Sequence, residues 1–280
     1  MSADAATAAT APGTTVGTAV GPLETHLRAA RASGRKLLLP YLTAGYAPGA
    51  DGGWTRLVEA VAHAGADGIE IGIPFSDPVM DGPTIQISSA AALEAGVTPA
   101  GILDDIERLD VPVPLIAMTY YNIPFRMGLT RYASNLKRAG IDGAILPDLP
   151  LEEAGPWTAE ADAAGVETVM LAAPTGSDER LAAVCERSRG FVYGVGLLGI
   201  TGERATLAAS ATRIASRLKA ITDKPVAIGV GVSTPAQAVE VAEVADGVVV
   251  GSAIIRALID HGFDACVDFV GSLRDGLDRG

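Results

Sequence analysis

Three similar stretches decide the fold of this chain: "GADGIEI" at residues 65–71, "GIDGAIL" at 140–146 and "VADGVVV" at 244–250. In each of them an Asp-Gly pair turns the chain out of a helical pattern, and an apolar strand pattern begins. The same design at widely separated places in the sequence is typical of repeated βα units. We therefore expect an α/β protein in which strands and helices alternate.

Strand-like runs recur along the chain, and helical patterns lie between them. The strand-like runs cover residues 37–42, 68–73, 113–119, 143–146, 167–172, 191–195, 226–230 and 247–250. Helical patterns cover, for example, residues 54–63, 131–138, 151–164 and 235–244. Strands alternating with helices in this number predict a (β/α)8 barrel, the TIM-barrel fold. A doubly wound open sheet is the alternative, but no early G-x-G-x-x-G fingerprint supports a dinucleotide site.

The composition is that of one large globular domain. The 280 residues are 49% hydrophobic and 19% charged, which predicts a sizeable core within a barrel at residues 23–280. The formal net charge is −12, and no dense basic cluster is present. This balance argues against nucleic acid or an anionic membrane as a partner. No run reaches the length of a membrane span.

The residues that could hold a metal are scattered. Cys185 and Cys266 have neither metal-ligand spacing nor a disulfide framework, and the three histidines stand apart. We expect no metal site, no cofactor and a reducing cytoplasm as the location. Residues 1–22 are rich in Ala, Thr and Gly and lack both periodicity and the features of a signal peptide. They are predicted to be a disordered extension.

Glu70 stands out because it interrupts an apolar strand. Ile69, Ile71 and Ile73 alternate, so Glu70 and Gly72 point to the opposite face, where Gly72 leaves the space beside Glu70 open. A paired core carboxylate is the alternative, but an unpaired buried charge is costly. Because barrel enzymes carry their chemistry at the C-terminal ends of strands, Glu70 is the leading catalytic candidate.

The loop after this strand carries two aspartates. Asp77 and Asp81 lie in "PFSDPVMDGP", residues 74–83, whose prolines and glycine prevent a helix until about Thr84. Both could be ordinary turn residues. Their position at the catalytic end of the second strand favours Asp81 as the second catalytic candidate.

A phosphate site is predicted where the last two strands end. Gly231 and Ser233 follow the seventh strand, and Gly251 and Ser252 follow the eighth. The glycines let the backbone approach a ligand, and the serines can cap helices whose free N–H groups attract an anion. Helix capping alone is the alternative. Two such turns at consecutive strand ends favour phosphate binding, and Gly202 can add further amides.

The loop after the sixth strand, residues 194–207, is long and rich in glycine. Such a loop can close over a substrate as a lid. A flexible surface connection is the alternative.

Several motifs, in this order, resemble those of the α subunit of tryptophan synthase. They are "IEIGIPFSDPVMDGPTIQ" (69–86), "MTYYN" (118–122), "ILPDLPLEEA" (145–154), "GITG" (199–202), "GVGVST" (229–234) and "VVGSAI" (249–254). The resemblance extends from about Arg35 to the C-terminus. It implies a TIM barrel that cleaves indole-3-glycerol phosphate by a retro-aldol reaction to indole and glyceraldehyde 3-phosphate.

The resemblance also implies roles for single residues. Glu70 matches the catalytic glutamate and Asp81 the catalytic aspartate of the family. The substrate-binding positions match Tyr41, Tyr120, Tyr193 and the lid residue Thr201, although the tyrosines could also be core residues. Gly202, Gly231 and Ser252 match phosphate-binding positions. Gly196 stands where the family usually carries serine, so lid closure should cost more entropy and Gly196→Ser should raise activity.

The resemblance further implies a partner, the β subunit of tryptophan synthase, which would carry pyridoxal phosphate in an α2β2 heterotetramer. Asp77 lies in the loop that would contact it. A stand-alone lyase that releases free indole for secondary metabolism is the alternative, and Gly196 would fit it. The retained Glu70 and Asp81 argue against a non-catalytic activator of a β-type partner. A phosphosugar isomerase would explain the phosphate loops, but it would not require "PFSDPVMDGP".

Overall fold

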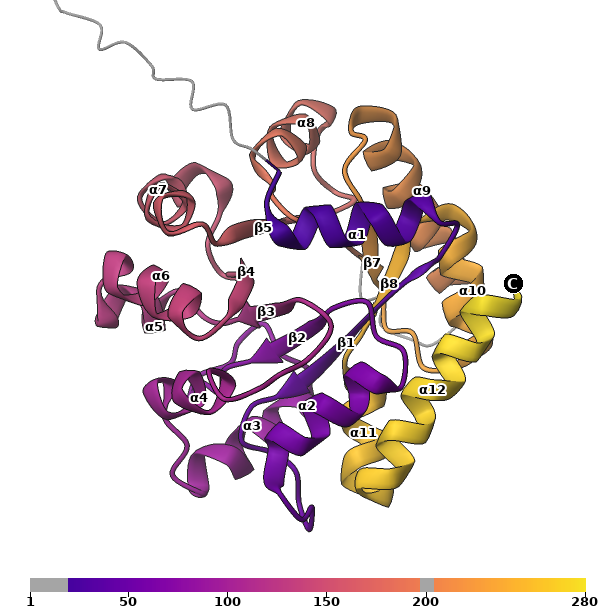
Figure 1. Cartoon of the computed structure of the whole chain (residues 1–280). Helices are drawn as coiled ribbons and strands as arrows, with labels where there is room; N and C mark the ends of the chain where they lie inside the picture. The colour runs from indigo at the N-terminus through magenta and orange to yellow at the C-terminus, as the bar shows by residue number, and fades with distance from the viewer. Residues whose placement is uncertain (1–19, 197–203) are drawn as a thin grey trace, which may run out of the picture.

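The computed structural model describes residues 20–196 and 204–280. Within these residues, eight parallel strands close into a barrel in sequence order, and β1 pairs with β8 to complete it (Figure 1). The predicted TIM barrel is therefore confirmed. The strands are β1 (Leu37–Thr43), β2 (Ile69–Gly72), β3 (Leu115–Met118), β4 (Ile141–Ile145), β5 (Glu167–Ala172), β6 (Val192–Val195), β7 (Val226–Gly229) and β8 (Gly247–Val250).

Helices surround the barrel. They are α1 (Pro22–Ala32), α2 (Gly53–His63), α3 (Pro83–Glu94), α4 (Pro99–Ile106), α5 (Asn122–Met127), α6 (Leu129–Arg138), α7 (Gly155–Ala164), α8 (Asp178–Arg187), α9 (Arg204–Ile221), α10 (Pro235–Val244), α11 (Ser252–His261) and α12 (Phe263–Arg279). A short 3₁₀ turn, η1 (Leu151–Glu153), precedes α7. The single helix predicted at 151–164 is therefore wrong, because Pro156 lacks an N–H and starts a new helix instead of continuing one.

Two of the three aspartates of the quoted stretches, Asp67 and Asp246, connect neighbouring strands. Asp142 instead lies within β4 and pairs with Lys137 at 3.6 Å, so the turn expected at Asp142-Gly143 is wrong. The Asp67 carboxylate accepts a hydrogen bond from the Leu38 N–H at 2.8 Å and pairs with Arg274 at 3.1 Å. The Asp246 carboxylate accepts from the Val226 N–H at 2.9 Å. Asp67 and Asp246 thus each tie the start of their own strand to a neighbouring strand through a charge-assisted hydrogen bond.

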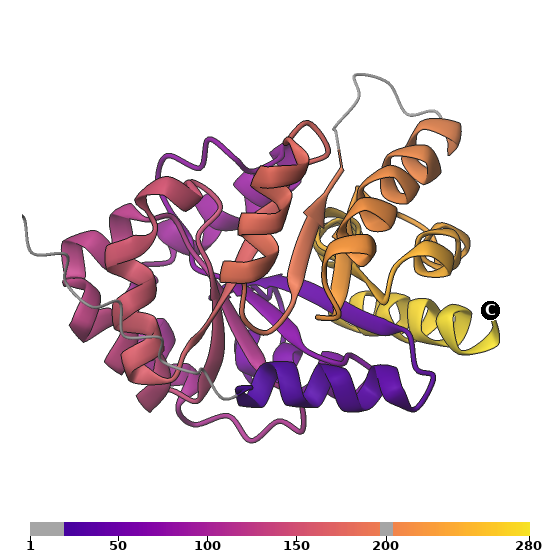
Figure 2. The ribbon, with the colours of Figure 1, turned by 90° about the horizontal axis from the view of Figure 1, so that it is seen from above.

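Helix α1 closes the N-terminal end of the barrel (Figures 1 and 2). Leu23 and Leu27 are fully buried in the cluster that fills the barrel interior, together with Leu37, Leu39, Ile116, Ile145, Val169, Phe191, Ala227 and Val249. A Cβ atom at Gly143 would lie 2.6 Å from Leu23 Cδ2, so only glycine leaves room for this leucine. Because this end is plugged, a substrate can enter the barrel only at the C-terminal ends of the strands.

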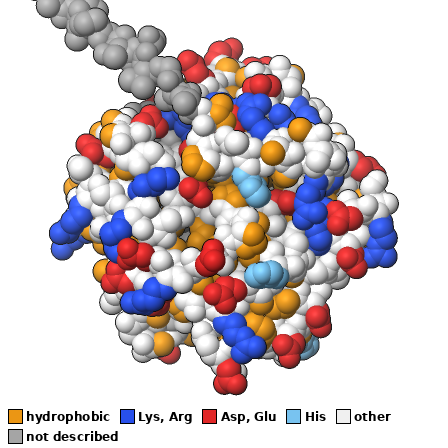
Figure 3. Space-filling model, in the orientation of Figure 1, with side chains coloured by type: hydrophobic (Ala, Val, Ile, Leu, Met, Phe, Trp, Pro, Cys, Tyr) orange, Lys and Arg blue, Asp and Glu red, His pale blue; other side chains and the backbone are white. Residues whose placement is uncertain are grey.

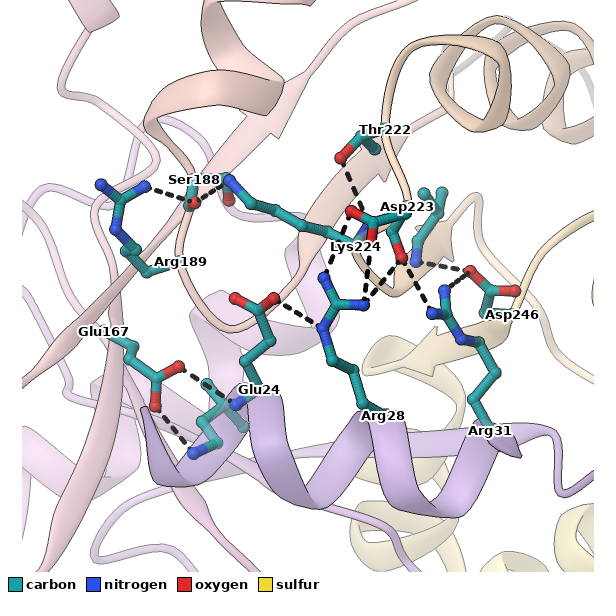
Figure 4. Close-up of polar contacts among 12 residues, drawn as sticks. Glu24, Arg28, Arg31, Glu167, Ser188, Arg189, Thr222, Asp223, Lys224 and Asp246 are labelled. Atoms are coloured by element: carbon teal, nitrogen blue, oxygen red, sulfur yellow. Dashed lines mark hydrogen bonds and ion pairs between the residues drawn. The ribbon is translucent and has the colours of Figure 1, made fainter. Parts of the chain in front are cut away.

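Polar contacts hold α1 in place (Figure 4). The Glu167 carboxylate accepts from the N–H groups of Leu23 and Glu24 at 2.7 and 3.1 Å, which satisfies free donors of the first turn. Further along the helix, Arg28 pairs with Glu24 at 2.8 Å and with Asp223 at 3.2 Å. The helix is therefore fixed to both β5 and the loop before β7.

The surface carries interspersed charges. On the face crossed by α1, acidic and basic side chains alternate without a patch of one sign (Figure 3). None of the helices in the described part of the chain is long and apolar enough to cross a membrane. Helix α1 begins at Pro22, one residue before the predicted start of the barrel. Of the predicted extension, residues 1–19 lie outside the described residues.

Candidate active site

Glu70 projects into the barrel from β2. It lies in register with Tyr41 on β1 and with Ile116 on β3, which belongs to the interior cluster. Its side chain is 1% exposed, and neither carboxylate oxygen has a hydrogen-bond partner among the residues that the structure describes. Burial raises the pKa of Glu70 to about 8. The carboxyl group therefore holds its proton at neutral pH.

Tyr41 fills the space beside Glu70. A Cβ atom at Gly72 would lie 1.8 Å from the Tyr41 hydroxyl oxygen. The expectation that Gly72 leaves this space open is therefore wrong: its missing side chain makes room for the phenol of the neighbouring strand. Burial raises the pKa of Tyr41, and the nearby carboxylates of Asp81 and Glu70 raise it further. The neutral phenol is thus near both catalytic candidates.

Tyr193 reaches the same interior from β6. A Cβ atom at Gly229 would lie 2.6 Å from the Tyr193 hydroxyl, and the ring stacks on Phe191 with 6.1 Å between the ring centres. Burial raises the pKa of Tyr193 well above its usual value, and the charge of Glu70 adds to the rise. Tyr41 and Tyr193 therefore lie near Glu70, each accommodated by a glycine on the next strand.

Asp81 and Tyr120 meet at the C-terminal end of the barrel. The Tyr120 hydroxyl accepts a hydrogen bond from the Met80 N–H at 2.9 Å, and its ring stacks on Phe75 at 5.1 Å between ring centres. Desolvation raises the pKa of the Asp81 carboxyl, and hydrogen bonding with the Tyr120 hydroxyl opposes this rise. Asp81 is half-buried, so its surroundings are wetter than those of Glu70.

The glycines that follow β7 and β8 have different structural roles. Gly231 has a φ of +80°, which a side chain would strain, and Gly251 is the N-cap residue of α11, with Ser252 as its first residue. Gly251 also lies beside Tyr41, because a Cβ atom added there would be 3.4 Å from Tyr41 Cβ. The free first turn of α11 therefore faces the same end of the barrel as the tyrosines.

The predicted helix caps at Ser233 and Ser252 are wrong. Thr234 caps α10 by accepting from the Gln237 N–H at 3.3 Å, because Pro235 takes the first helical position. The Ser233 N–H and hydroxyl both donate to Gln237 Oε1, at 2.8 and 2.9 Å. Gln237 escaped the sequence reasoning, although an amide four residues after Ser233 is within reach in the first turn of a helix.

Asp148 is a further residue that the sequence reasoning missed. Its two carboxylate oxygens accept from the Tyr121 N–H at 2.9 and 3.1 Å, which joins the loop after β4 to the loop after β3. An aspartate two residues after a predicted barrel strand was the available signal.

The remaining predicted residues fall into two groups. Asp77 is exposed and accepts a hydrogen bond from the Ser76 hydroxyl at 2.6 Å. Thr201 and Gly202, and most of the predicted lid, lie outside the described residues. Across residues 20–196 and 204–280, no three His, Cys, Asp or Glu side chains are grouped so that they could hold a metal ion.

Residues 27–267 match the family model described as "Tryptophan synthase alpha chain". The chain belongs to this family. The tryptophan synthase alpha chain of Streptomyces avermitilis is 41% identical over 265 residues, which cover 92% of this chain and 95% of that protein. The alpha chain of Thermobifida fusca is 43% identical over 242 residues, which cover 85% of this chain and 89% of that protein.

Solved tryptophan synthase structures share the fold. A chain of Mycobacterium tuberculosis tryptophan synthase superposes with a TM-score of 0.84 at 36% identity, covering 94% of this chain and 100% of that one. The alpha subunit from Legionella pneumophila gives a TM-score of 0.84 at 31% identity with the same coverage. As a tryptophan synthase alpha chain, the protein is a carbon–carbon lyase of tryptophan biosynthesis that cleaves indole-3-glycerol phosphate. Alpha chains of this family typically form a complex with a β subunit.

Proposed function

We propose that Glu70 and Asp81 are the catalytic pair with which this alpha chain cleaves its substrate to indole and glyceraldehyde 3-phosphate. Bond breaking requires a proton at indole C3 and loss of a proton from the neighbouring side-chain hydroxyl. Glu70, whose carboxyl group is protonated at neutral pH and unpartnered within the described chain, can donate the first proton. The resulting carboxylate is then suited to accept the second.

Asp81 has the complementary role. Protonation at C3 leaves positive charge on the indole nitrogen, and an ionised Asp81 that accepts from the N–H stabilises that charge. The Tyr120 hydroxyl opposes the rise in the Asp81 pKa, which favours the ionised form. The two carboxyl groups thus occupy unlike environments, as an acid and an electrostatic stabiliser require.

The rest of the site binds the two ends of the substrate. Tyr41, Tyr120 and Tyr193 contact the indole ring. The backbone at Gly231 and Gly251 and the first turn of α11 at Ser252 bind the phosphate, with Gly202 and Ser233 as further contacts. Thr201 is a further substrate-binding residue, in the lid. Ser233 can contribute only if the phosphate replaces Gln237 Oε1 as the acceptor of its two hydrogen bonds.

The partner is a pyridoxal-phosphate-dependent β subunit in an α2β2 complex in the cytoplasm. The Asp77 loop itself carries two exposed apolar side chains, Val79 (82% exposed) and Met80 (56%), and Phe125 on α5 is 63% exposed. Exposed apolar side chains that lie together are typical of a protein-binding surface, and we assign these three to one apolar patch. Within this assembly we assign catalysis to the barrel at residues 23–280, with residues 1–22 as an extension.

The buried carboxyl group of Glu70, which has no hydrogen-bond partner in the described part of the chain, is the main support for this proposal, and Glu70→Gln tests it. The variant keeps the shape of the side chain and loses the titrating proton, so indole release should fall by at least about 1000-fold. Glu94→Gln, the same change on the exposed end of α3, should retain full activity. Turnover by Glu70→Gln within tenfold of the unmodified chain would refute the assignment of Glu70 as the acid.

A further inference from the structure

Two buried hydroxyl groups outside the proposed catalytic set lie next to Tyr41. Thr43 is the last residue of β1 and is 1% exposed, and Ser88 on α3 is fully buried. Their hydroxyl oxygens are 2.7 Å apart, and the Ser88 hydroxyl donates to the Ile85 carbonyl oxygen at 2.9 Å. Because both side chains are shielded from solvent, water does not compete for these hydrogen bonds.

The Tyr41 hydroxyl lies beside this pair. A Cβ atom at Gly72 would lie 1.8 Å from the Tyr41 hydroxyl oxygen, and Gly72 is the register partner of Thr43. The phenol therefore reaches along β1 to the level of Thr43, whose hydroxyl is its hydrogen-bond partner. Tyr41, Thr43, Ser88 and the Ile85 carbonyl thus form one chain of hydrogen bonds.

The direction of this chain follows from its protons. Each hydroxyl has one proton, and a carbonyl oxygen can only accept. Ser88 gives its proton to the Ile85 carbonyl, so Thr43 donates to Ser88 and Tyr41 donates to Thr43. This order uses all three protons, whereas in the reverse order the Tyr41 proton points out of the chain. The Tyr41 oxygen therefore keeps a lone pair for a donor in the active site.

Tyr41 stands between the reacting groups and the phosphate helix. Glu70 on β2 is its register partner. A Cβ atom at Gly251, the N-cap residue of α11, would lie 3.4 Å from Tyr41 Cβ. With the indole ring near Glu70 and the phosphate at α11, the three-carbon chain that joins them passes Tyr41. Of its two hydroxyl groups, the one next to the ring gives its proton to Glu70, which leaves the one nearer the phosphate for Tyr41.

We propose that Thr43 and Ser88 are positioning residues that fix the Tyr41 oxygen as the acceptor for the substrate hydroxyl group nearer the phosphate. The inference rests on the proposed function, from which it takes the positions of ring and phosphate. The hydrogen bond holds the three-carbon chain so that the carbon next to the ring faces Glu70. Without the Thr43 hydroxyl, the phenol turns its proton toward the substrate, and the substrate hydroxyl no longer has a fixed acceptor.

Two analogues that cannot be cleaved test this role without relying on catalysis. The analogue 2-hydroxy-3-(indol-3-yl)propyl phosphate keeps only the hydroxyl group nearer the phosphate, and 3-(indol-3-yl)propyl phosphate keeps neither. Both lack the hydroxyl group next to the ring, whose proton the retro-aldol reaction removes. Calorimetry with the unmodified chain should show that the hydroxyl-bearing analogue binds at least about fivefold tighter.

Changes at Thr43 and Ser88 should reduce this difference between the analogues. Thr43→Val, which keeps the shape of the side chain, and Ser88→Ala should each lower it at least about threefold, whereas Thr43→Ser keeps the hydroxyl and should preserve it. Affinity for the analogue without hydroxyl groups should stay unchanged, because only a disturbed fold would weaken both. Adding Thr43→Val to Tyr41→Phe should have no further effect, since both changes act on one hydrogen bond.

The results distinguish a failure of this inference from a failure of the proposed function. Equal affinity of both analogues for the unmodified chain, or an unchanged difference in Thr43→Val and Ser88→Ala, would overturn the positioning role alone. Equal weakening of both analogues by these variants would show a purely structural role and would overturn it too. Failure of both analogues to bind the unmodified chain would refute the proposed ring and phosphate sites, and this inference with them.

Discussion

At the scale of single residues, Glu70 shows what strand periodicity can and cannot predict. Alternation with Ile69 and Ile71 correctly placed its side chain on the interior face of β2. The same pattern could not reveal that the Tyr41 hydroxyl fills the space over Gly72, because that contact joins two strands. Likewise, the pairing of Ser233 with Gln237 depends on where α10 begins, which Pro235 decides.

The buried Glu70 carboxyl makes the stability of this chain depend on pH. Its native pKa of about 8 lies above the value of about 4.3 expected in the unfolded chain. Below pH 4 both states are protonated. As pH rises from about 4 to 8, only the unfolded state releases the proton, so the native state loses stability.

We therefore predict that Glu70→Gln gains stability relative to the unmodified chain as pH rises through this window. The gain is at most about 1.4 kcal/mol for each pH unit between the two pKa values, and it levels off above about pH 8. Urea unfolding at several pH values measures it. A stability difference that stays constant from pH 4 to 8 would mean that Glu70 titrates normally in the native state.

At the scale of elements, the strands were more predictable than the helices. Buried apolar runs follow from residue type, so β5 and β8 begin and end where the sequence predicted. Helix α1 was not predicted, since its function as a plug depends on the glycine at 143 and on Glu167, which are distant in sequence. The Gly155-Pro156 break was visible in the sequence but was overlooked.

Helix α1 should contribute strongly to stability and little to chemistry. Leu23→Ala removes a fully buried side chain at the plugged end of the barrel and should cost about 2–5 kcal/mol of unfolding free energy. The KM for indole-3-glycerol phosphate should stay unchanged at temperatures where the variant is folded. Urea unfolding and indole-release kinetics test this, and a raised KM with unchanged stability would contradict it.

The packing around Gly196, which directly follows β6, argues against the expectation that Gly196→Ser raises activity. A Cβ atom at Gly196 would lie 2.4 Å from Val230 Cγ1 and 3.2 Å from the Val230 Cα. Gly196→Ser should therefore displace the end of β7 and lower both activity and melting temperature, where lid entropy alone predicted a gain.

The double variant Gly196→Ser with Val230→Ala separates the two causes. It removes the clashing methyl groups, so it should recover part of the lost melting temperature. Enhanced indole release by Gly196→Ser alone would show that lid entropy outweighs this packing.

At the scale of the whole molecule, helix α1 closes the N-terminal end of the barrel, so substrate and partner must bind at the C-terminal ends of the strands. The Asp77 loop and α5 meet there through Tyr120, which binds Met80 and directly precedes Tyr121, whose ring lies 5.9 Å from that of Phe125. The sequence predicted the loop through its aspartates. It could not predict the apolar patch, because the exposure of Val79 and Phe125 follows only from the folded chain.

If this patch binds the β subunit, a charge on it should uncouple the two subunits. Phe125→Asp places a carboxylate in the proposed interface, so the rise in indole formation on adding β subunit should fall at least about tenfold. Activity of the isolated chain should stay unchanged. Ile221→Asp, the same kind of change at an exposed apolar residue of α9, is the control and should be activated normally.

Two outcomes would contradict this assignment. Isolated protein that already turns over as fast as its mixture with the β subunit would favour a stand-alone lyase. Normal activation of Phe125→Asp would place the interface elsewhere on the barrel.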